Sequence, residues 1–404
     1  MSAEGIPGLR PEEAQHAVSH WVRQAVECTG AAAPDMASAD LVFVDLHCYG
    51  RWHMGRWFYG RLSDEVKGSE GLAALAADPD PDALMLRAMR ELQGGERWRR
   101  SRGQDFVIAP FFPGFNDSML QVLAPCADAK PFMLAAEHRQ FCPGNQRAAR
   151  TGRGMLVPHV AVSDVDFADD GLSTRDTLIF SHGACANTAD PSVKWSSGKL
   201  MRTRLTAALA ASNASDVDSQ CACAICKGSL SHAETMARMR RSVFCPVLPG
   251  DTQSSRRLAE VVLSGCIPVF VGPPYHTLSM PLDVDYRALG VFLHVNDTSG
   301  WILDKGPGAA RANGKGLLGR WWTDVVLSHD DYLRVQSVRD VEPALRALGE
   351  DVVASKQRAL KEQRDLLYYK TPPGQQCSRL GRRIVDRLCE YSAARKEARQ
   401  TAQQ

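Results

Sequence analysis

Short apolar runs separated by polar stretches recur along the chain. Their length and composition are those of strands that are buried on both faces of a sheet. Eight such runs lie at Leu41–Leu46, Phe106–Pro110, Pro131–Ala135, Gly154–Pro158, Thr177–Phe180, Val243–Leu248, Cys266–Val271 and Val291–Val295. Patterns typical of helices lie between several of them. Strands that alternate with helices predict parallel sheets covered on both faces, which is the α/β class.

The expected helices cover Glu12–Cys28, the 80s to Glu91, Lys199–Ala211, Ser231–Arg241 and Ser254–Ser264. A polar, acidic segment at Ser163–Arg175 marks the expected boundary between two α/β domains, at 39–165 and 175–330. Residues 1–38 are expected to form a partly disordered lead-in. Residues 331–404 are predicted to be helices that pack back across the domains, broken at Thr371–Gly374 and frayed from Ala393. Two facing α/β domains leave a ligand cleft at the carboxyl ends of their strands.

Composition and charge narrow the class of protein. The 404 residues include 48 Lys and Arg against 46 Asp and Glu, so no bulk attraction to nucleic acid is present and no nucleic-acid partner is expected. No window approaches the roughly 18 uncharged apolar residues of a membrane helix. The first residues do not resemble a signal peptide, so we expect neither an anchor nor a signal peptide in this chain.

The cysteines leave several alternatives open. Twelve cysteines are too few for a disulfide scaffold. The group Cys221, Cys223 and Cys226, with Cys185, is compatible with a structural disulfide, with inert thiols or with half of a zinc site. Acceptor sequons at Asn116, Asn213 and Asn296 favour a secretory lumen. Cys245 and Cys266 fall in expected strands and are predicted to be buried thiols.

One stretch, Ser242–Val271, carries the most chemical information. It predicts a strand, a turn at Gly250, a helix and a second strand. Several residues of the turn can cap the helix, and the first helical turn exposes N–H groups that suit a diphosphate. Arg257 adds a positive charge there, and Glu260 follows on the same face, where a carboxylate can accept from both hydroxyls of a ribose. The alternative is a solvated Arg–Glu pair on a helix surface.

The residue pattern of this stretch is specific. It reads Phe-Cys-x-x-x-x-Gly-Asp-Thr-x-Ser-Ser-x-Arg-Leu-x-Glu from Phe244, followed by Ser-Gly-Cys-Ile-Pro-Val from Ser264. This pattern closely resembles the signature of the exostosin-like glycosyltransferases, especially their plant and algal cell-wall branch. Further matches keep the family's order over roughly residues 39–295, at Ala39–Val44, Gly103–Phe106, Val157–Pro158, Arg175–Phe180 and Arg202–Leu205.

The resemblance implies a GT-B architecture of two facing Rossmann-like domains. Residues 39–165 would bind the acceptor, and residues 175–330 would bind a nucleotide sugar, expected to be a UDP-sugar. The implied reaction is inverting transfer to a cell-wall or extracellular glycan, without a metal or other cofactor. Carried over by position, the resemblance assigns donor binding to Gly183, Arg202, Ser254, Ser255, Arg257 and Glu260.

The resemblance also implies a location and partners. These are the Golgi lumen, a type II membrane protein in full-length form, a glycan or glycoprotein acceptor, and possible assembly with itself or another glycosyltransferase. The sequence departs from the family at Asp45, where proline is common, and at His182, where a small residue is usual.

Inverting transfer needs a general base that takes a proton from the acceptor hydroxyl. Asp45 and His47 follow the first expected strand and rank first, and His159 comes next. Capping or core roles are the alternative for each of them.

Two aromatic groups are candidate sugar contacts. Trp52, Trp57 and Tyr59 form a dense group that suits the apolar faces of a sugar acceptor, with a plain core as the alternative. The arginine-rich run Arg97–Arg102 could hold an acidic glycan, but a solvated loop is the preferred interpretation.

Three Asp-x-Asp pairs begin at Asp164, Asp216 and Asp283 and have the spacing of metal sites, yet they fall in expected loops.

Two other functions stay open besides the enzyme. One is a catalytically inactive relative that binds glycan or supports a partner, and the other is a thiol or zinc protein built on Cys221–Cys226.

Overall fold

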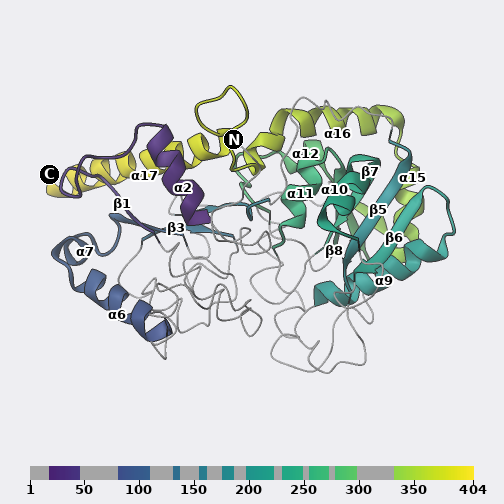
Figure 1. Ribbon diagram of the computed structural model, residues 1–404, viewed down its shortest axis with the longest axis horizontal. Helices are drawn as coiled ribbons and strands as arrows, with labels where there is room; N and C mark the ends of the chain where they lie inside the picture. The colour runs from purple at the N-terminus through teal and green to yellow at the C-terminus, as the bar shows by residue number, and fades with distance from the viewer. Residues whose placement is uncertain are drawn as a thin grey trace, which may run out of the picture. The chain divides into compact units, whose positions relative to one another are not determined.

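The computed structural model describes residues 18–45, 81–109, 131–136, 154–161, 175–185, 197–222, 230–248, 254–272, 278–297 and 332–404 (Figure 1). The chain divides into two compact units. Unit 1 consists of Met1–Val162 together with Tyr369–Gln404, and unit 2 is the continuous segment Ser163–Tyr368. Each unit is described by itself below.

Unit 1 is built on a parallel sheet in the order β1-β2-β3-β4. Its strands are β1 (Val42–Val44), β2 (Phe106–Ile108), β3 (Phe132–Ala135) and β4 (Gly154–Leu156). The last three are buried along their whole length, as their uninterrupted apolar sequences predict, whereas β1 at the edge is half-buried. Helices α6 (Pro81–Gly94) and α7 (Glu96–Ser101) lie between β1 and β2 in the sequence.

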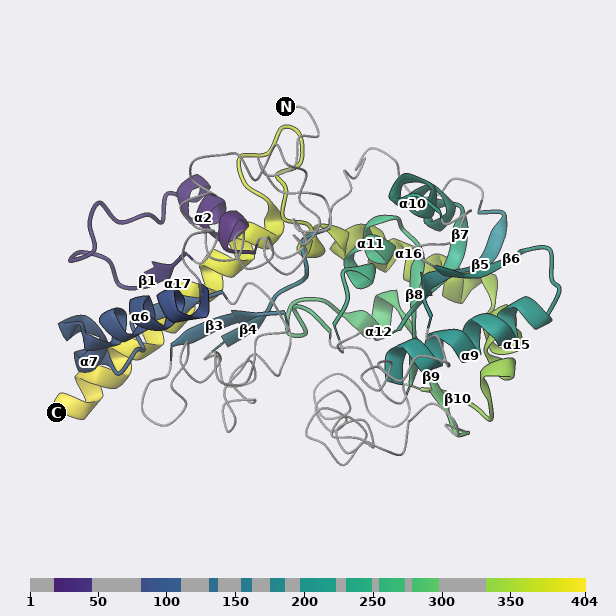
Figure 2. The ribbon, with the colours of Figure 1, turned by 60° about the horizontal axis from the view of Figure 1, so that its bottom comes forward.

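The first and last described helices of the chain pack together in unit 1. Helix α2 (Val18–Cys28) contacts α17 (Arg379–Gln403), and the disulfide Cys28–Cys377 joins α2 to the residue just before the cap of α17. Their approach is close, because a Cβ on Gly381 would lie 3.0 Å from the Cβ of Ala25. Both views show α17 as one uninterrupted helix (Figures 1 and 2). The helix continues past Ala393, where fraying is expected from the sequence, to Gln403.

The arginine-rich run at Arg97–Arg102 is a helix for most of its length rather than the loop that the sequence favoured, although Arg99, Arg100 and Arg102 are exposed as expected. Residues 96–101 form α7, in which Trp98 is 4% exposed and packs on Phe106 with ring centroids 4.7 Å apart. Arg97 donates to the carbonyl oxygens of Ala39 and Asp40. These two side chains therefore belong to the structure of unit 1.

Unit 2 is built on a six-stranded parallel sheet in the order β10-β9-β8-β7-β5-β6. The strands are β5 (Thr177–Ala184), β6 (Val217–Ala222), β7 (Ser242–Val247), β8 (Ile267–Gly272), β9 (Val291–Val295) and β10 (Leu333–Val335). From β5 the chain first adds β6 on one side and then β7 on the other. The order therefore reverses between β5 and β7, and a crevice at the carboxyl ends of such strands is where open α/β sheets bind ligands.

Helices join consecutive strands of unit 2, as parallel pairing requires. They are α9 (Ser197–Ala211) after β5, α10 (His232–Arg240) after β6, α11 (Arg257–Leu263) after β7 and α12 (Tyr286–Leu289) after β8. The tail of the unit contains η4 (Val338–Asp340), α15 (Val341–Arg346), α16 (Glu350–Gln363) and η5 (Arg364–Leu367). The segment from Tyr332 is not helical throughout, since β10 pairs with β9 through Leu333 and Leu293.

Among the described helices, none combines the length and the apolar character needed to cross a membrane.

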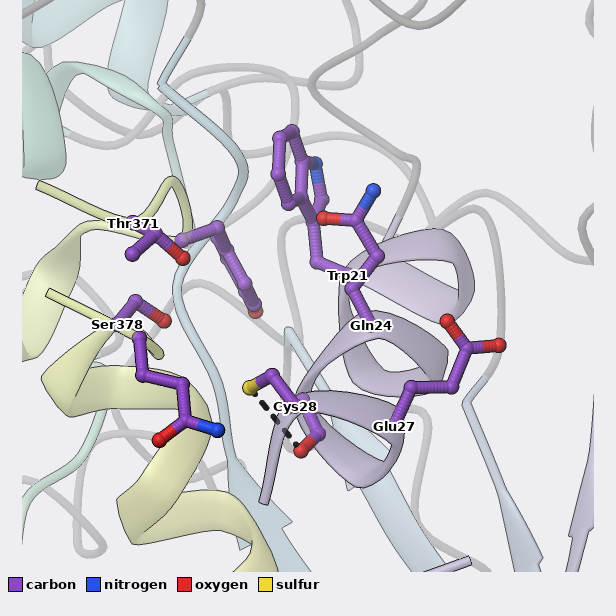
Figure 3. A pocket seen from close by; sticks show the side chains of 9 residues that line it. Trp21, Gln24, Glu27, Cys28, Thr371 and Ser378 are labelled. Carbon is purple, nitrogen blue, oxygen red and sulfur yellow. Dashed lines mark hydrogen bonds between the residues drawn. The ribbon is translucent and has the colours of Figure 1, made fainter. Parts of the chain in front are cut away.

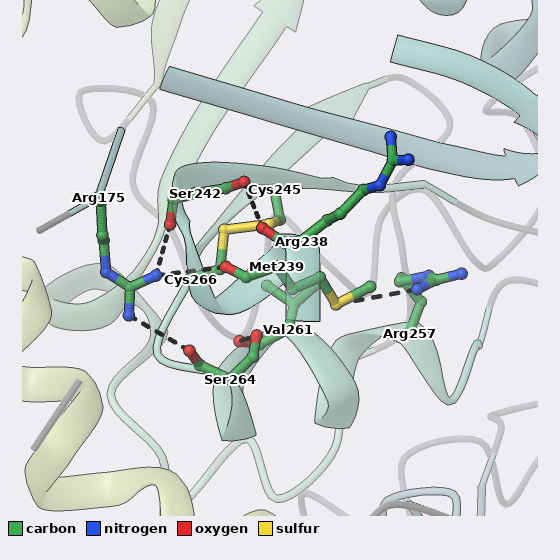
Figure 4. The surroundings of a disulfide bond; sticks show 9 residues. All are labelled: Arg175, Arg238, Met239, Ser242, Cys245, Arg257, Val261, Ser264 and Cys266. Carbon is green, nitrogen blue, oxygen red and sulfur yellow. Dashed lines mark hydrogen bonds between the residues drawn. A yellow bond between two sulfur atoms is a disulfide. The ribbon is translucent and has the colours of Figure 1, made fainter. Parts of the chain in front are cut away.

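Two disulfides lie in the described part of unit 2. Cys185–Cys221 joins the end of β5 to β6 and is one of the pairings that the sequence left open. Cys245–Cys266 joins β7 to the residue before β8, with the Cα atoms 5.9 Å apart (Figure 4). The prediction of buried thiols at Cys245 and Cys266 is therefore wrong, although both residues are buried.

Removing the Cys245–Cys266 bond should destabilise unit 2. A bond that closes a loop of this size restricts the unfolded chain and contributes about 3 kcal/mol. The double variant Cys245→Ala/Cys266→Ala should therefore melt roughly 6–12 °C lower in scanning calorimetry. Cys389→Ala is the matched control, because this thiol is free and exposed and its loss should leave the melting temperature unchanged. Equal melting of the double variant and the wild type would contradict a structural role for this disulfide.

Candidate donor site

Arg202, on α9, lies across the carboxyl ends of the two strands that flank the switch in strand order. Its Nη2 donates to the carbonyl oxygen of Leu248, just after β7, at 3.0 Å, and its Nη1 donates to that of Ala184, at the end of β5, at 3.5 Å. Gly183 lies directly beneath, since a Cβ there would be 3.6 Å from Cδ of Arg202. Two of the residues assigned to donor binding therefore meet at the predicted ligand crevice of the sheet.

His182 precedes Gly183 and is directed toward α10. Its ring stacks on Phe180, and its Nδ1 lies 3.5 Å from Oγ1 of Thr235. Burial lowers the pKa of His182, and the positive charge of Arg257 lowers it further. The end of β5 therefore lies within electrostatic reach of the donor motif on α11.

The donor motif forms a shorter helix than the sequence predicted. Helix α11 begins at Arg257 rather than Ser254, and the residue at its N-cap, Arg256, makes no side-chain cap. Ser255 instead accepts a 3.2 Å hydrogen bond at its Oγ from the backbone N–H of Arg257. Ser254 is buried, with 6% exposure. Both serines thus lie in the segment that leads into α11.

Glu260 is the most deeply buried charged group among the described residues of the motif, with 2% of its side chain exposed. Arg256 Nε lies 3.0 Å from Oε1, and Arg257 Nη1 lies 3.4 Å from Oε2. His232 on α10 brings its Nε2 within 3.6 Å of Oε1. The Arg–Glu pair predicted from the spacing is present, but it is not the solvated surface pair of the alternative interpretation.

One oxygen of this carboxylate has unused hydrogen-bonding capacity. Oε1 of Glu260 is buried, and no hydrogen bond in the described structure reaches it. The adjacent Arg256 and His232 satisfy its charge by proximity without the geometry of a hydrogen bond. A buried acceptor left unsatisfied costs about 1–3 kcal/mol, which a ligand hydroxyl that donates to it would offset.

Arg257 is held on both sides. Its guanidinium pairs with Glu260 and contacts the Sδ atom of Met239 at 3.8 Å (Figure 4). Burial lowers its pKa, while the charge of Glu260 acts in the opposite direction. About a fifth of the side chain, 21%, stays exposed, so the guanidinium can still meet a ligand.

Unit 1 holds those candidate bases that the structure describes. Asp45 follows β1, and its carboxylate lies 3.8 Å from Nη1 of Arg23. His159 follows β4 and is 7% exposed. His47 and the aromatic candidates Trp52, Trp57 and Tyr59 lie outside the described residues. The assignment of the base stays a prediction.

The Asp-x-Asp pairs that the structure describes are occupied by protein contacts. Asp218 lies in β6 rather than in a loop and pairs with Arg238 at 2.7 Å. Asp216 accepts from Arg346, which lowers the pKa of its carboxyl. Asp285 caps α12. No group of three or more His, Cys, Asp and Glu side chains suited to a metal ion occurs in the described part of the chain. Cys221 is bonded to Cys185, so the zinc-protein hypothesis loses one of its ligands.

Comparison with known proteins decides the family. Residues 13–304 match the exostosin GT47 domain, which is most of the chain. The chain belongs to the exostosin GT47 family. This confirms the resemblance inferred from the motif, and the two parallel α/β sheets agree with the GT-B fold of the family.

A segment of 70 residues is 37% identical to a probable xyloglucan galactosyltransferase GT14 of Arabidopsis thaliana. It covers 17% of this chain and 13% of that protein, so the chain matches only a small part of this curated relative.

Within the exostosin motif, sequence reasoning missed Arg256 and His232 as neighbours of Glu260. Arg256 could have been predicted, because residues four apart share a helix face. His232 could not, because only the fold brings α10 next to Glu260.

The contacts of His232 predict a pH dependence of stability. Burial is the main cause that lowers its pKa from the usual 6.5, and Arg256 and Arg257 lower it further against the opposing effect of Glu260. The unfolded chain therefore takes up a proton at a higher pH than the folded protein, and stability falls as the pH drops below about 6.5. His232→Gln removes this proton uptake.

The test compares melting temperatures of wild type and His232→Gln between pH 8 and pH 5. The advantage of the wild type over the variant should shrink, or reverse, as the pH falls. The difference at pH 8, where both side chains are neutral, serves as the reference. A difference that stays constant or grows on acidification would show that His232 is not the buried neutral group described here.

Proposed function

We propose that this chain is an inverting glycosyltransferase that moves a sugar from a UDP-sugar to a cell-wall or extracellular glycan. The observation that carries the proposal is the buried carboxylate of Glu260, which pairs with two arginines and has one oxygen that no hydrogen bond from the described residues reaches. Membership in the exostosin GT47 family and the similarity to a plant protein named as a probable xyloglucan galactosyltransferase support it.

In the proposed complex the ribose hydroxyls donate to Glu260, and the guanidinium groups of Arg202 and Arg257 stabilise the diphosphate. A base then takes the proton of the acceptor hydroxyl while its oxygen attacks the anomeric carbon. The bond from that carbon to the diphosphate oxygen breaks at the same time, and UDP leaves with the negative charge that the arginines stabilise. Attack from the face opposite the leaving group inverts the configuration.

Other parts of the proposal rest on the sequence and on the family resemblance. Asp45, His47 and His159 are the proposed candidates for the base, and Trp52, Trp57 and Tyr59 for acceptor contacts. Ser254 and Ser255 complete the proposed donor site. We also propose that the full-length protein acts in the Golgi lumen as a type II membrane protein and assembles with itself or with another glycosyltransferase.

Glu260→Gln tests the role of the carboxylate. The amide keeps the shape but offers one acceptor oxygen in place of two and carries no charge. Losing a charge-assisted hydrogen bond of about 1.5–3 kcal/mol should weaken UDP binding at least tenfold, as measured by calorimetric titration.

The 2′-deoxy form of UDP supplies the internal control, because each protein is compared with itself. Wild type should bind the ribose form more tightly than the deoxy form, and Glu260→Gln should lose most of that preference. A variant that keeps the full preference for ribose would exclude Glu260 as the ribose ligand. A wild-type protein that binds neither UDP nor any UDP-sugar would instead favour an inactive glycan-binding relative.

The proposed site neutralises the leaving diphosphate with arginines, so turnover should not need a divalent ion. We expect the rate of sugar transfer or of donor hydrolysis, measured through the release of UDP, to be unchanged by EDTA. Activity that disappears in EDTA and returns with manganese would contradict this part of the mechanism.

A further inference from the structure

A pocket of about 480 Å³ lies between α2 and the segment that leads into α17. All residues that line it belong to unit 1, whereas the donor motif belongs to unit 2. Figure 3 shows Trp21, Gln24 and Cys28 on α2 across from Thr371 and Ser378 on the other wall. The volume falls within the usual range of small-ligand sites, roughly 300–1,000 Å³.

The walls of the pocket are fixed by covalent and hydrogen bonds. The disulfide Cys28–Cys377 ties the two walls together at one end. Tyr369 donates from its hydroxyl to the carbonyl oxygen of Pro158 at 2.9 Å, which fixes its ring. Ser378 accepts from the backbone N–H of Gly381 at 3.0 Å as the cap of α17. A pocket that is held in shape before a ligand arrives loses little conformational entropy on binding.

The lining combines aromatic faces with neutral hydrogen-bonding groups. The rings of Trp21 and Tyr369 lie 6.4 Å apart and are inclined by 32°. Trp21 Nε1 is a buried donor that no hydrogen bond in the described structure satisfies. Gln24, Thr371 and Gln376 add amide and hydroxyl groups.

Charge is confined to one side of the pocket. The carboxylate of Glu27 lies 3.8 Å from Arg23, and its side chain points away from Thr371 and Ser378 (Figure 3). A ligand of this pocket must therefore offer an apolar face to the rings and hydroxyl groups to the neutral amides. A sugar ring has both properties, with apolar C–H faces and hydroxyls around its edge.

We propose that this pocket binds one pyranose unit of a neutral glycan, as a subsite separate from the donor site. The class of ligand follows from the pocket itself. Its role, which is to hold the polysaccharide that is being extended or branched, rests on the proposed function.

Binding is tested on the full chain without nucleotide, by saturation-transfer NMR and titration with xylotetraose and cellotetraose. A single sugar unit in an open pocket makes few contacts, so we expect a dissociation constant on the order of 1 mM for at least one of the two. Tetragalacturonate is the charged comparison and should bind at least tenfold more weakly.

The variants separate this pocket from other surfaces. Trp21→Ala removes the main aromatic face and should weaken binding roughly tenfold or more. Gln376→Ala should weaken it severalfold, and its neighbour Gln375→Ala, which does not line the pocket, should leave it unchanged. Because Trp21 also packs on Tyr369, the Gln376 and Gln375 pair decides the test if Trp21→Ala does not fold.

Three outcomes would overturn the proposal. The first is that neither neutral tetrasaccharide binds at a concentration 10-fold above the expected dissociation constant. The second is that tetragalacturonate binds as tightly as the neutral tetrasaccharides or more tightly. The third is that Gln376→Ala and Gln375→Ala bind the neutral tetrasaccharide with equal affinity.

Arg257→Ala distinguishes this proposal from the proposed function. It should lose UDP affinity and keep oligosaccharide affinity. If the wild-type protein binds the oligosaccharide but no UDP-sugar, the result would support the sugar-binding pocket and contradict the proposed glycosyltransferase activity. If the protein binds UDP but neither neutral tetrasaccharide, the result would support the donor site and contradict the sugar-binding pocket.

Discussion

The buried carboxylate of Glu260 is the constraint that organises the donor half of the protein. An ionised carboxylate with 2% exposure is stable only with positive charge beside it, and removing one partner of a buried pair typically costs about 3–5 kcal/mol. Arg256 and Arg257 precede it by four and three residues, so one turn of α11 presents both to the same group. These pairs lie within one helix and fix the three side chains relative to one another, whereas His232 on α10 contacts the carboxylate from a neighbouring element. The direction of Arg257 is therefore set by its pairing with Glu260, and the placement of α11 by the packing of its buried residues.

Two other arginines hold the elements around α11 from opposite ends of the sheet. Arg202 joins the carboxyl ends of β5 and β7, where a ligand would bind. At the amino end, Arg175 donates to the carbonyl oxygens of Met239, Ser242 and Ser264, which close α10, begin β7 and follow α11 (Figure 4). The Cys245–Cys266 bond lies between them. The strand, helix and strand of the donor motif are thus tied to one another by hydrogen bonds at both ends and by a disulfide.

The pattern of apolar residues located all eight expected strands, because strands buried on both faces leave an uninterrupted apolar signature. It missed β6 and β10, which are the two edges of the unit 2 sheet. Edge strands carry polar residues on their open side, and a sequence such as that of Val217–Ala222 does not differ from a loop by pattern alone. Within the site, helix spacing was enough to bring Arg257 and Glu260 together. His232 and the Cys245–Cys266 bond depend on tertiary packing, which local spacing does not encode.

Unit 1 is formed from two separate segments of the chain, and contacts between them cannot be predicted from local spacing either. Asp105, with 6% of its side chain exposed, is held by Arg97 at 3.4 Å and, from the end of α17, by Arg395 and by Arg399 at 2.9 Å. Tyr391 on the same helix donates to the carbonyl oxygen of Gln104.

Residues near the C-terminus therefore neutralise a charge near the start of β2, almost three hundred positions earlier in the chain. Unit 2, in contrast, is one continuous segment of the chain. In unit 1 the buried aspartate gains two of its arginine partners only from the last helix of the chain. A segment whose composition suggests a loose tail is thus required for the charge balance of the first unit.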